Sequence, residues 1–153
     1  MIRKASYVGL FAVVVGVVGV IALERRLSVG PIVLGLTVVP LIGLAAARRA
    51  LKSAVPDLVF GALDTGLLTI PALSGGFFFG VAGAIAGGVI GDALTDSIAG
   101  FFEGGIAEWL RGRGIEESRE PITTALGKMA GCLFGSGLIL TAALLVGVQP
   151  TFD

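Results

Sequence analysis

The chain has 153 residues, of which 55% are hydrophobic and 14% charged, and it contains 25 glycines. A soluble domain usually carries about 25% charged residues, so this composition predicts an all-α, polytopic membrane protein with closely packed helices. Eleven basic residues balance eleven acidic ones and histidine is absent, so we expect neither a nucleic-acid partner nor enzymatic chemistry.

Two apolar stretches in the N-terminal third predict two transmembrane helices. Residues 7–23 lack a small-x-small cleavage pattern and are followed at once by another apolar run, so we expect a retained helix and not a signal peptide. Residues 29–47 form the second stretch, and Pro40 inside it predicts a kink. These helices form an N-terminal unit, residues 1–52.

Three further apolar stretches, within residues 56–148, bring the predicted number of spans to about five. The third covers residues 57–73 and ends at the Ser74-Gly75-Gly76 turn, the fourth covers residues 77–110, and the fifth covers residues 122–148. The fourth would be about 50 Å long, against a hydrocarbon core of about 30 Å. Its charged last third is therefore expected to project into the cytoplasm.

The distribution of basic residues predicts the orientation. With five spans, the N-terminus, the second loop and the fourth loop share one side, which we expect to be cytoplasmic by the positive-inside rule, with the C-terminus outside. Without a long transit sequence, a prokaryotic cytoplasmic membrane is the expected location. The basic residues on the expected cytoplasmic side are Arg3, Lys4, Arg48, Arg49, Lys52, Arg111, Arg113 and Arg119, against Arg25 and Arg26 on the other side.

Acidic residues inside the third and fourth stretches are the strongest functional clue. Asp92 and Asp96 lie one helical turn apart and share a face with Glu103. A charged side chain in hydrocarbon costs about 2.5 kcal/mol or more, so it rarely persists without a partner or a function. The rise per residue places Asp64, the Asp92/Asp96 pair and Lys128 at similar depth near the cytoplasmic side.

Two interpretations of these residues compete. In the structural one, Lys128 pairs with an aspartate and the remaining carboxylates face a wet crevice. In the functional one, which we favour, hard oxygen ligands hold Ca²⁺, Na⁺ or Mg²⁺, and Lys128 compensates the charge when the ion leaves. The expected ligands are Asp64, Asp92, Thr95, Asp96 and Glu103.

Small residues recur every fourth position on the fifth stretch, at Gly127, Gly131 and Gly135. This pattern predicts a tight contact between helices. The chain shows no inverted repeat, so we expect a homodimer to supply the symmetry of a transporter, with the glycine ladders as candidate interfaces.

Three short motifs follow one another: Phe60-Gly-Ala-Leu-Asp64, then Gly91-Asp92-Ala-Leu-Thr95-Asp96 with Ala99-Gly100, then Thr124-Ala-Leu-Gly127-Lys128. Over residues 56–147 their order and spacing resemble the TMEM65 family of membrane proteins. The resemblance implies a three-helix core and a link to sodium-dependent calcium efflux, as exchanger or regulator. The family has Asn in place of Asp92 and Ser in place of Thr95, which leaves Ca²⁺ specificity open here.

The leading hypothesis is therefore a membrane cation transporter that exchanges Na⁺ for Ca²⁺ and needs no cofactor beyond these ions. The alternative is a non-transporting membrane protein that regulates another transporter, with residues 101–120 as the docking segment. A simple channel ranks last, because abundant buried carboxylate favours tight binding over rapid conduction.

Overall fold

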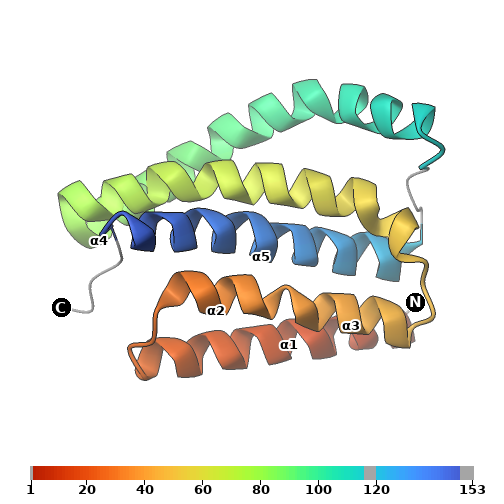
Figure 1. Ribbon diagram of the computed structural model, residues 1–153, viewed down its shortest axis with the longest axis horizontal. Helices are drawn as coiled ribbons and strands as arrows, with labels where there is room; N and C mark the ends of the chain where they lie inside the picture. The colour runs from red at the N-terminus through yellow and green to blue at the C-terminus, as the bar shows by residue number, and fades with distance from the viewer. Residues whose placement is uncertain (1, 116–119, 149–153) are drawn as a thin grey trace.

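Helices make up every regular element that the structure describes. The computed structural model describes residues 2–115 and 120–148, with the backbone alone for residues 99–104, 106 and 107. The all-α prediction is thereby confirmed. The elements are α1 (Ile2–Glu24), α2 (Val29–Leu36), α3 (Val38–Ala46), α4 (Leu51–Gly112) and α5 (Pro121–Leu145) (Figure 1).

The second apolar stretch forms one rod that is interrupted at Thr37, between α2 and α3 (Figure 1). Pro40 has no N–H and cannot donate to the carbonyl of Leu36, four residues before it. The helix tightens at this point, and the Thr37 N–H bonds to the Leu34 carbonyl at 3.2 Å. The predicted interruption is confirmed, three residues before the proline.

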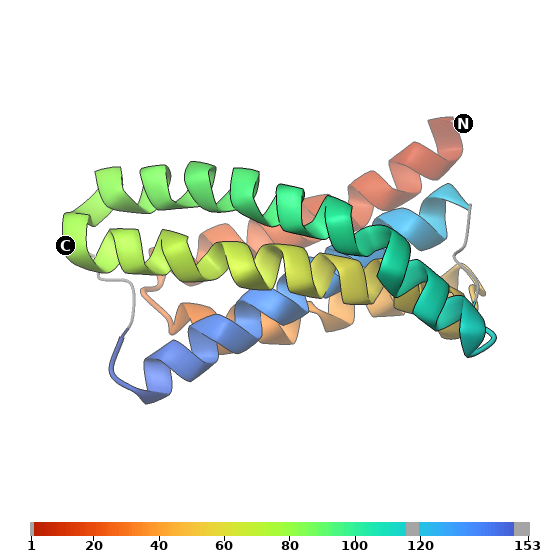
Figure 2. The same cartoon turned by 90° about the horizontal axis from the view of Figure 1, so that it is seen from above.

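The third and fourth stretches belong to α4, which folds back on itself at Gly80. Gly80 has φ 63° and ψ −150°, a conformation essentially restricted to glycine. The two arms, residues 51–79 and 81–112, run antiparallel (Figure 2). The predicted turn at residues 74–76 is therefore wrong. Gly75 and Gly83 bring the arms into backbone contact, so that glycine serves packing there.

Helix α5 lies at the centre of the bundle and contacts each of the other helices (Figure 1). On one side, Gly127 and Gly131 meet the first arm of α4, where a Cβ on Gly131 would collide with the carbonyl of Leu58. On the other side, Gly137 meets Leu34 of α2. The predicted tight contact is confirmed. The ladder of α5 packs against α4 within the chain and is not free for a dimer interface in this conformation, so the homodimer itself stays a prediction.

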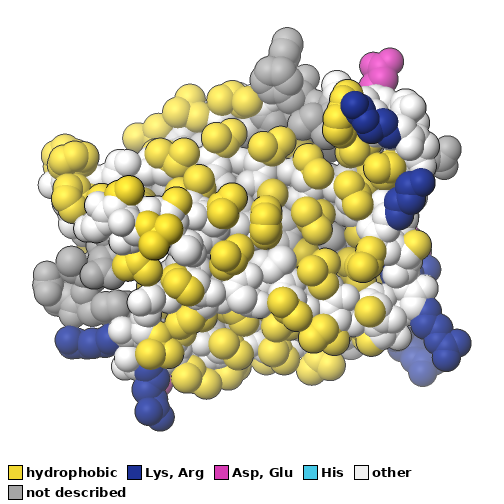
Figure 3. Space-filling view, viewed as in Figure 1, with side chains coloured by type: hydrophobic (Ala, Val, Ile, Leu, Met, Phe, Trp, Pro, Cys, Tyr) yellow, Lys and Arg dark blue, Asp and Glu magenta, His cyan; other side chains and the backbone are white. Residues whose placement is uncertain are grey.

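The surface carries an apolar band between two charged ends (Figure 3). Large apolar side chains such as Phe78 and Val81 are more than two-thirds exposed. Four described segments are long and apolar enough to cross a membrane, including a 48-residue part of α4, Leu51–Ile98. At 1.5 Å per residue that part would be about 72 Å long if straight, and the turn at Gly80 folds it back. These features indicate a membrane protein.

The contact of α5 with the first arm of α4 predicts a large cost for adding one methyl group. Gly131→Ala should lower the free energy of unfolding by about 1–3 kcal/mol, because the new Cβ would overlap backbone atoms of Leu58 and Ala62. Thermal unfolding of the purified protein in detergent measures this.

Gly88→Ala is the matched control, since a Cβ at Gly88 would meet nothing within 4 Å. That variant should be neutral or more stable by about 0.5–1 kcal/mol, through helix propensity. Equal destabilisation by both substitutions would contradict the packing role of Gly131.

Candidate cation site

The two arms of α4 pack in a regular antiparallel register. Asp64 lies four residues before Leu68 on the first arm, and Thr95 lies four residues after Gly91 on the second. One further turn of the register therefore predicts Asp64 and Thr95 at the same level. The register is set where Gly83 meets Gly75, Gly87 meets Pro71, and Gly91 meets Leu68.

Asp64 carries an unsatisfied carboxylate oxygen, on the side of the first arm that includes Leu68 and Pro71. Its Oδ1 is shielded from solvent and has no hydrogen-bond partner among the described residues. Thr95 is 5% exposed, and its hydroxyl donates to the carbonyl of Asp92 at 3.2 Å. Leaving a buried acceptor unsatisfied costs about 1–3 kcal/mol, and more for a charged group. Among the atoms of the predicted site, this oxygen therefore gains most from a bound cation or another hydrogen-bond partner.

The remaining predicted ligands lie less favourably. The side chains of Asp92 and Asp96 are exposed, and the side chain of Glu103 is outside the described part. Among the described residues, no three acidic or cysteine side chains lie close enough to share a metal ion. The register of the arms predicts Asp64 and Thr95 at one level, but the described residues do not gather three carboxylates, so the ligand set stays a prediction.

Lys128 makes no ion pair with Asp64, Asp92 or Asp96, all of which are described. Its side chain is exposed, and its Nζ lies 4.6 Å from the centroid of the Phe60 ring. The pairing expected in the structural interpretation is therefore absent from this conformation. Phe60 precedes Asp64 by one helical turn on the same face, so the ammonium lies on the side of α4 that carries Asp64.

A hydroxyl cluster continues the polar seam beyond Asp64. The hydroxyls of Thr69 on α4 and Ser136 on α5 lie 3.0 Å apart, and they reach the carbonyl of Thr65 at 2.7 Å and 3.3 Å. Hydroxyls that bridge helices in this way hold them together in an apolar environment. No local pattern in the sequence indicates the pairing of Thr69 with Ser136.

Asp57 is a second acidic residue that the sequence analysis missed. The apolar pattern predicts Asp57 as the first residue of the third stretch, yet α4 begins at Leu51 and Asp57 is only 2% exposed. A Cβ at Gly127 of α5 would lie 2.9 Å from the Cβ of Asp57. The missing side chain of Gly127 therefore makes room for this aspartate. Asp57 and Asp64 are seven residues apart and share a face.

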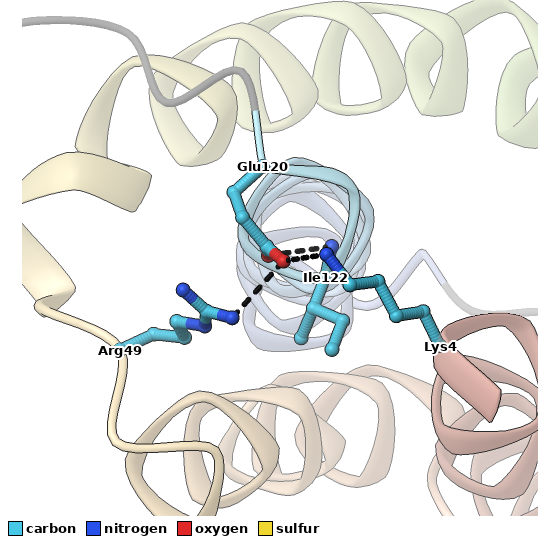
Figure 4. Close-up of polar contacts among 4 residues, drawn as sticks. All are labelled: Lys4, Arg49, Glu120 and Ile122. Carbon is cyan, nitrogen blue, oxygen red and sulfur yellow. Dashed lines mark hydrogen bonds and ion pairs between the residues drawn. The ribbon is translucent and has the colours of Figure 1, made fainter. Parts of the chain in front are cut away.

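Glu120 joins three parts of the bundle at the end where the N-terminus lies (Figure 4). Its Oε1 accepts from Lys4 of α1 at 2.6 Å and from Arg49, between α3 and α4, at 3.0 Å. Its Oε2 accepts from the backbone N–H of Ile122 at 3.1 Å and caps α5. The hydrogen bond from Lys4 comes first among the causes that hold the pKa of Glu120 below 4.5.

Arg113 to Glu120 mixes charges of both signs, which predicts a solvated loop or helix end and not this cluster. An acidic residue directly before Pro121, at the start of a helical pattern, is the signal that could have revealed it. The cap could be predicted locally. The partners Lys4 and Arg49 depend on how distant helices pack.

Comparison with known protein families, with characterised proteins and with solved structures gives no match.

The Glu120 cluster predicts a pH dependence of stability. Because the folded-state pKa lies below the ordinary value of 4.5, the stabilisation is complete above that value and is lost as the pH falls through the folded-state pKa. Glu120→Gln should lower the free energy of unfolding by about 1 kcal/mol at pH 7, through the lost ion pairs and weakened cap.

The difference between wild type and Glu120→Gln should remain constant between about pH 7 and pH 5.5 and shrink below pH 4.5. Chemical denaturation at several pH values measures it. Glu108→Gln, at an exposed position of α4, is the control and should change little. A difference that grows on acidification would contradict the assignment.

Proposed function

We propose that the protein is a membrane cation transporter that exchanges Na⁺ for Ca²⁺ or a related cation through a carboxylate site on α4. The observation that supports it most is the Asp64 carboxylate, whose Oδ1 is buried with no hydrogen-bond partner among the described residues. A hard cation is the partner that such an oxygen lacks, since carboxylate, hydroxyl and carbonyl oxygens are the ligands of Na⁺ and Ca²⁺.

The second arm of the hairpin would complete the ligand set. Asp92 and Asp96 lie on the second arm, near Thr95, and their side chains are exposed in this conformation. A modest rotation or approach of the second arm would carry them toward Asp64. A site that is complete in one conformation and open in another is what alternating access requires.

Competition between ions follows from this arrangement. The same carboxylates would hold either Ca²⁺ or Na⁺, and Lys128 would offset their charge when the site is empty. The proposed location is a prokaryotic cytoplasmic membrane with the Glu120 cluster on the cytoplasmic side. A homodimer, if it forms, must use a surface other than the ladder of α5.

Reconstitution in liposomes tests the proposal. With Na⁺ inside and none outside, wild-type protein should accumulate ⁴⁵Ca²⁺, and dissipating the Na⁺ gradient should stop accumulation. Asp64→Asn should reduce uptake by about tenfold or more, because a neutral amide is a poorer ligand for a hard cation. Asp96→Asn should also reduce it.

Glu108→Gln is the matched control for flux, because it removes an exposed carboxylate from the same arm as Asp96. Wild-type uptake by Asp64→Asn would refute the carboxylate site. Absence of flux in the wild type, together with Ca²⁺ binding that Asp64→Asn abolishes, would support the alternative function, a regulator of another transporter.

Lys128→Gln tests the charge-compensating role. Removing the ammonium should alter the concentration of Ca²⁺ at half-maximal uptake, since a neutral residue no longer competes with the ion for the carboxylates. The wild-type contact of Lys128 with Phe60 suggests Lys128→Arg as the conservative control. An unchanged half-maximal concentration in Lys128→Gln would eliminate this role.

A further inference from the structure

The break between α2 and α3 carries an unusual buried hydroxyl. Thr37 is 7% exposed, and its Oγ1 is shielded from solvent with no hydrogen-bond partner among the described residues. Helical serine and threonine hydroxyls normally bond to a carbonyl three or four residues back. The described hydroxyls of Ser6, Ser53, Thr69, Ser74, Thr95, Ser97 and Thr141 all do so.

Backbone carbonyls accompany this hydroxyl at the break. Pro40 is fully buried and has no N–H, so the carbonyl of Leu36 lacks its regular helical donor. The Thr37 N–H bonds to Leu34, so the regular helical bond to Val33 is displaced as well. A hydroxyl oxygen and one or two carbonyl oxygens without their usual donors are thus grouped within one turn.

The break also lies at the middle of a segment that could cross a membrane. Val29–Ala46 is the 18-residue apolar segment that could cross a membrane, and Thr37 is at its middle. Interrupted helices whose freed carbonyls coordinate Na⁺ near the bilayer midplane are a recurrent device of secondary transporters. Irregular backbone inside a membrane otherwise leaves a polar group unsatisfied, which is strongly unfavourable.

We propose that the α2–α3 break is a second cation site, selective for a monovalent ion such as Na⁺, with Thr37 Oγ1 and the carbonyl of Leu36 as ligands. Residues 28–47 contain no charged side chain. A neutral ligand set suits a monovalent ion better than Ca²⁺, which is usually bound by several carboxylates. Since the hydroxyl is out of contact with solvent in this conformation, an ion held there would be occluded.

The site is separate from the carboxylates of α4. Gly137 of α5 faces Leu34 of α2, and Leu126 of α5 approaches Gly43 of α3. Thr37 is therefore level with the part of α5 between Leu126 and Gly137. The intervening Lys128 points away, toward Phe60 of α4. Helix α5 therefore lies between the two sites. The inference extends the proposed exchange of cations, but its test does not depend on transport.

Thermal unfolding of the purified protein in detergent, with NaCl replaced stepwise by choline chloride at constant ionic strength, provides that test. The Asp64→Asn background removes Na⁺ binding to the carboxylates, and it should retain a Na⁺-dependent rise in Tm. Adding Thr37→Val should abolish this rise or raise the Na⁺ concentration at its midpoint by about tenfold or more. Adding Thr37→Ser should preserve it.

Thr141→Val is the matched control, because its hydroxyl donates to the carbonyl of Gly137 at 2.6 Å and is already satisfied. It should leave the Na⁺ response unchanged. Pro40→Ala restores an N–H that can bond to the Leu36 carbonyl and should weaken the response without touching Thr37. In the absence of Na⁺, Thr37→Val should unfold at the same temperature as its parent or higher, since it removes an unsatisfied hydroxyl.

A Na⁺-dependent shift that survives Thr37→Val would overturn the site, and so would the absence of any shift in Asp64→Asn. Loss of ⁴⁵Ca²⁺ transport with an intact, Thr37-dependent Na⁺ shift would refute the proposed exchange and support this site. An equal shift with KCl would retain the site and show that it accepts monovalent cations generally.

Discussion

The close contact between α5 and the first arm of α4 is the constraint on which the rest of the molecule depends. Without a hydrophobic driving force between helices in lipid, association relies on close packing, and small residues allow it. Here the glycines of α5 let backbone approach backbone at Leu58 and Ala62. This approach holds Asp57 in the interface and brings Thr69 to Ser136, so the polar seam exists only because the helices are so close.

Close packing through glycines also explains the hairpin of α4. Gly80 permits the reversal, and Gly83, Gly87 and Gly91 then allow the second arm to lie on the first at successive turns. Beyond Gly91, one more turn of the same register predicts Thr95 at the level of Asp64. Packing residues thus determine which polar residues meet, although none of the glycines needs to contact an ion.

Much of this could be read from the sequence, and the exceptions have physical causes. Apolar stretches, Pro40 and the ladder of α5 are local signals, and they predicted the helices, the break and the tight contact. The turn was misplaced because Gly75 and Gly76 look like a turn in sequence, whereas only the packed structure shows that they meet Gly83 and Ala84.

Long-range pairs could not be predicted in the same way. Depth along a helix follows from the rise per residue, which is why Asp64 and Lys128 were expected at similar levels. Rotation about the helix axis is set by packing, and it turns Lys128 to Phe60 in place of an aspartate. Similarly, Glu120 meets Lys4 and Arg49 only because α5 lies beside both α1 and α3.

The central position of α5 also bears on how two ion sites could influence one another. One face of α5 packs on α4 beside the proposed carboxylate site, and the other packs on α2 at Gly137, one turn from the level of Thr37. A closely packed helix cannot shift against one neighbour without disturbing the other, because interiors this dense repack in discrete steps. An ion at the α2–α3 break that fixes the position of α5 would therefore alter the geometry between α5 and α4. Coupling of Na⁺ to a second cation in the proposed exchanger would require such a link, and α5 lies where it would provide it.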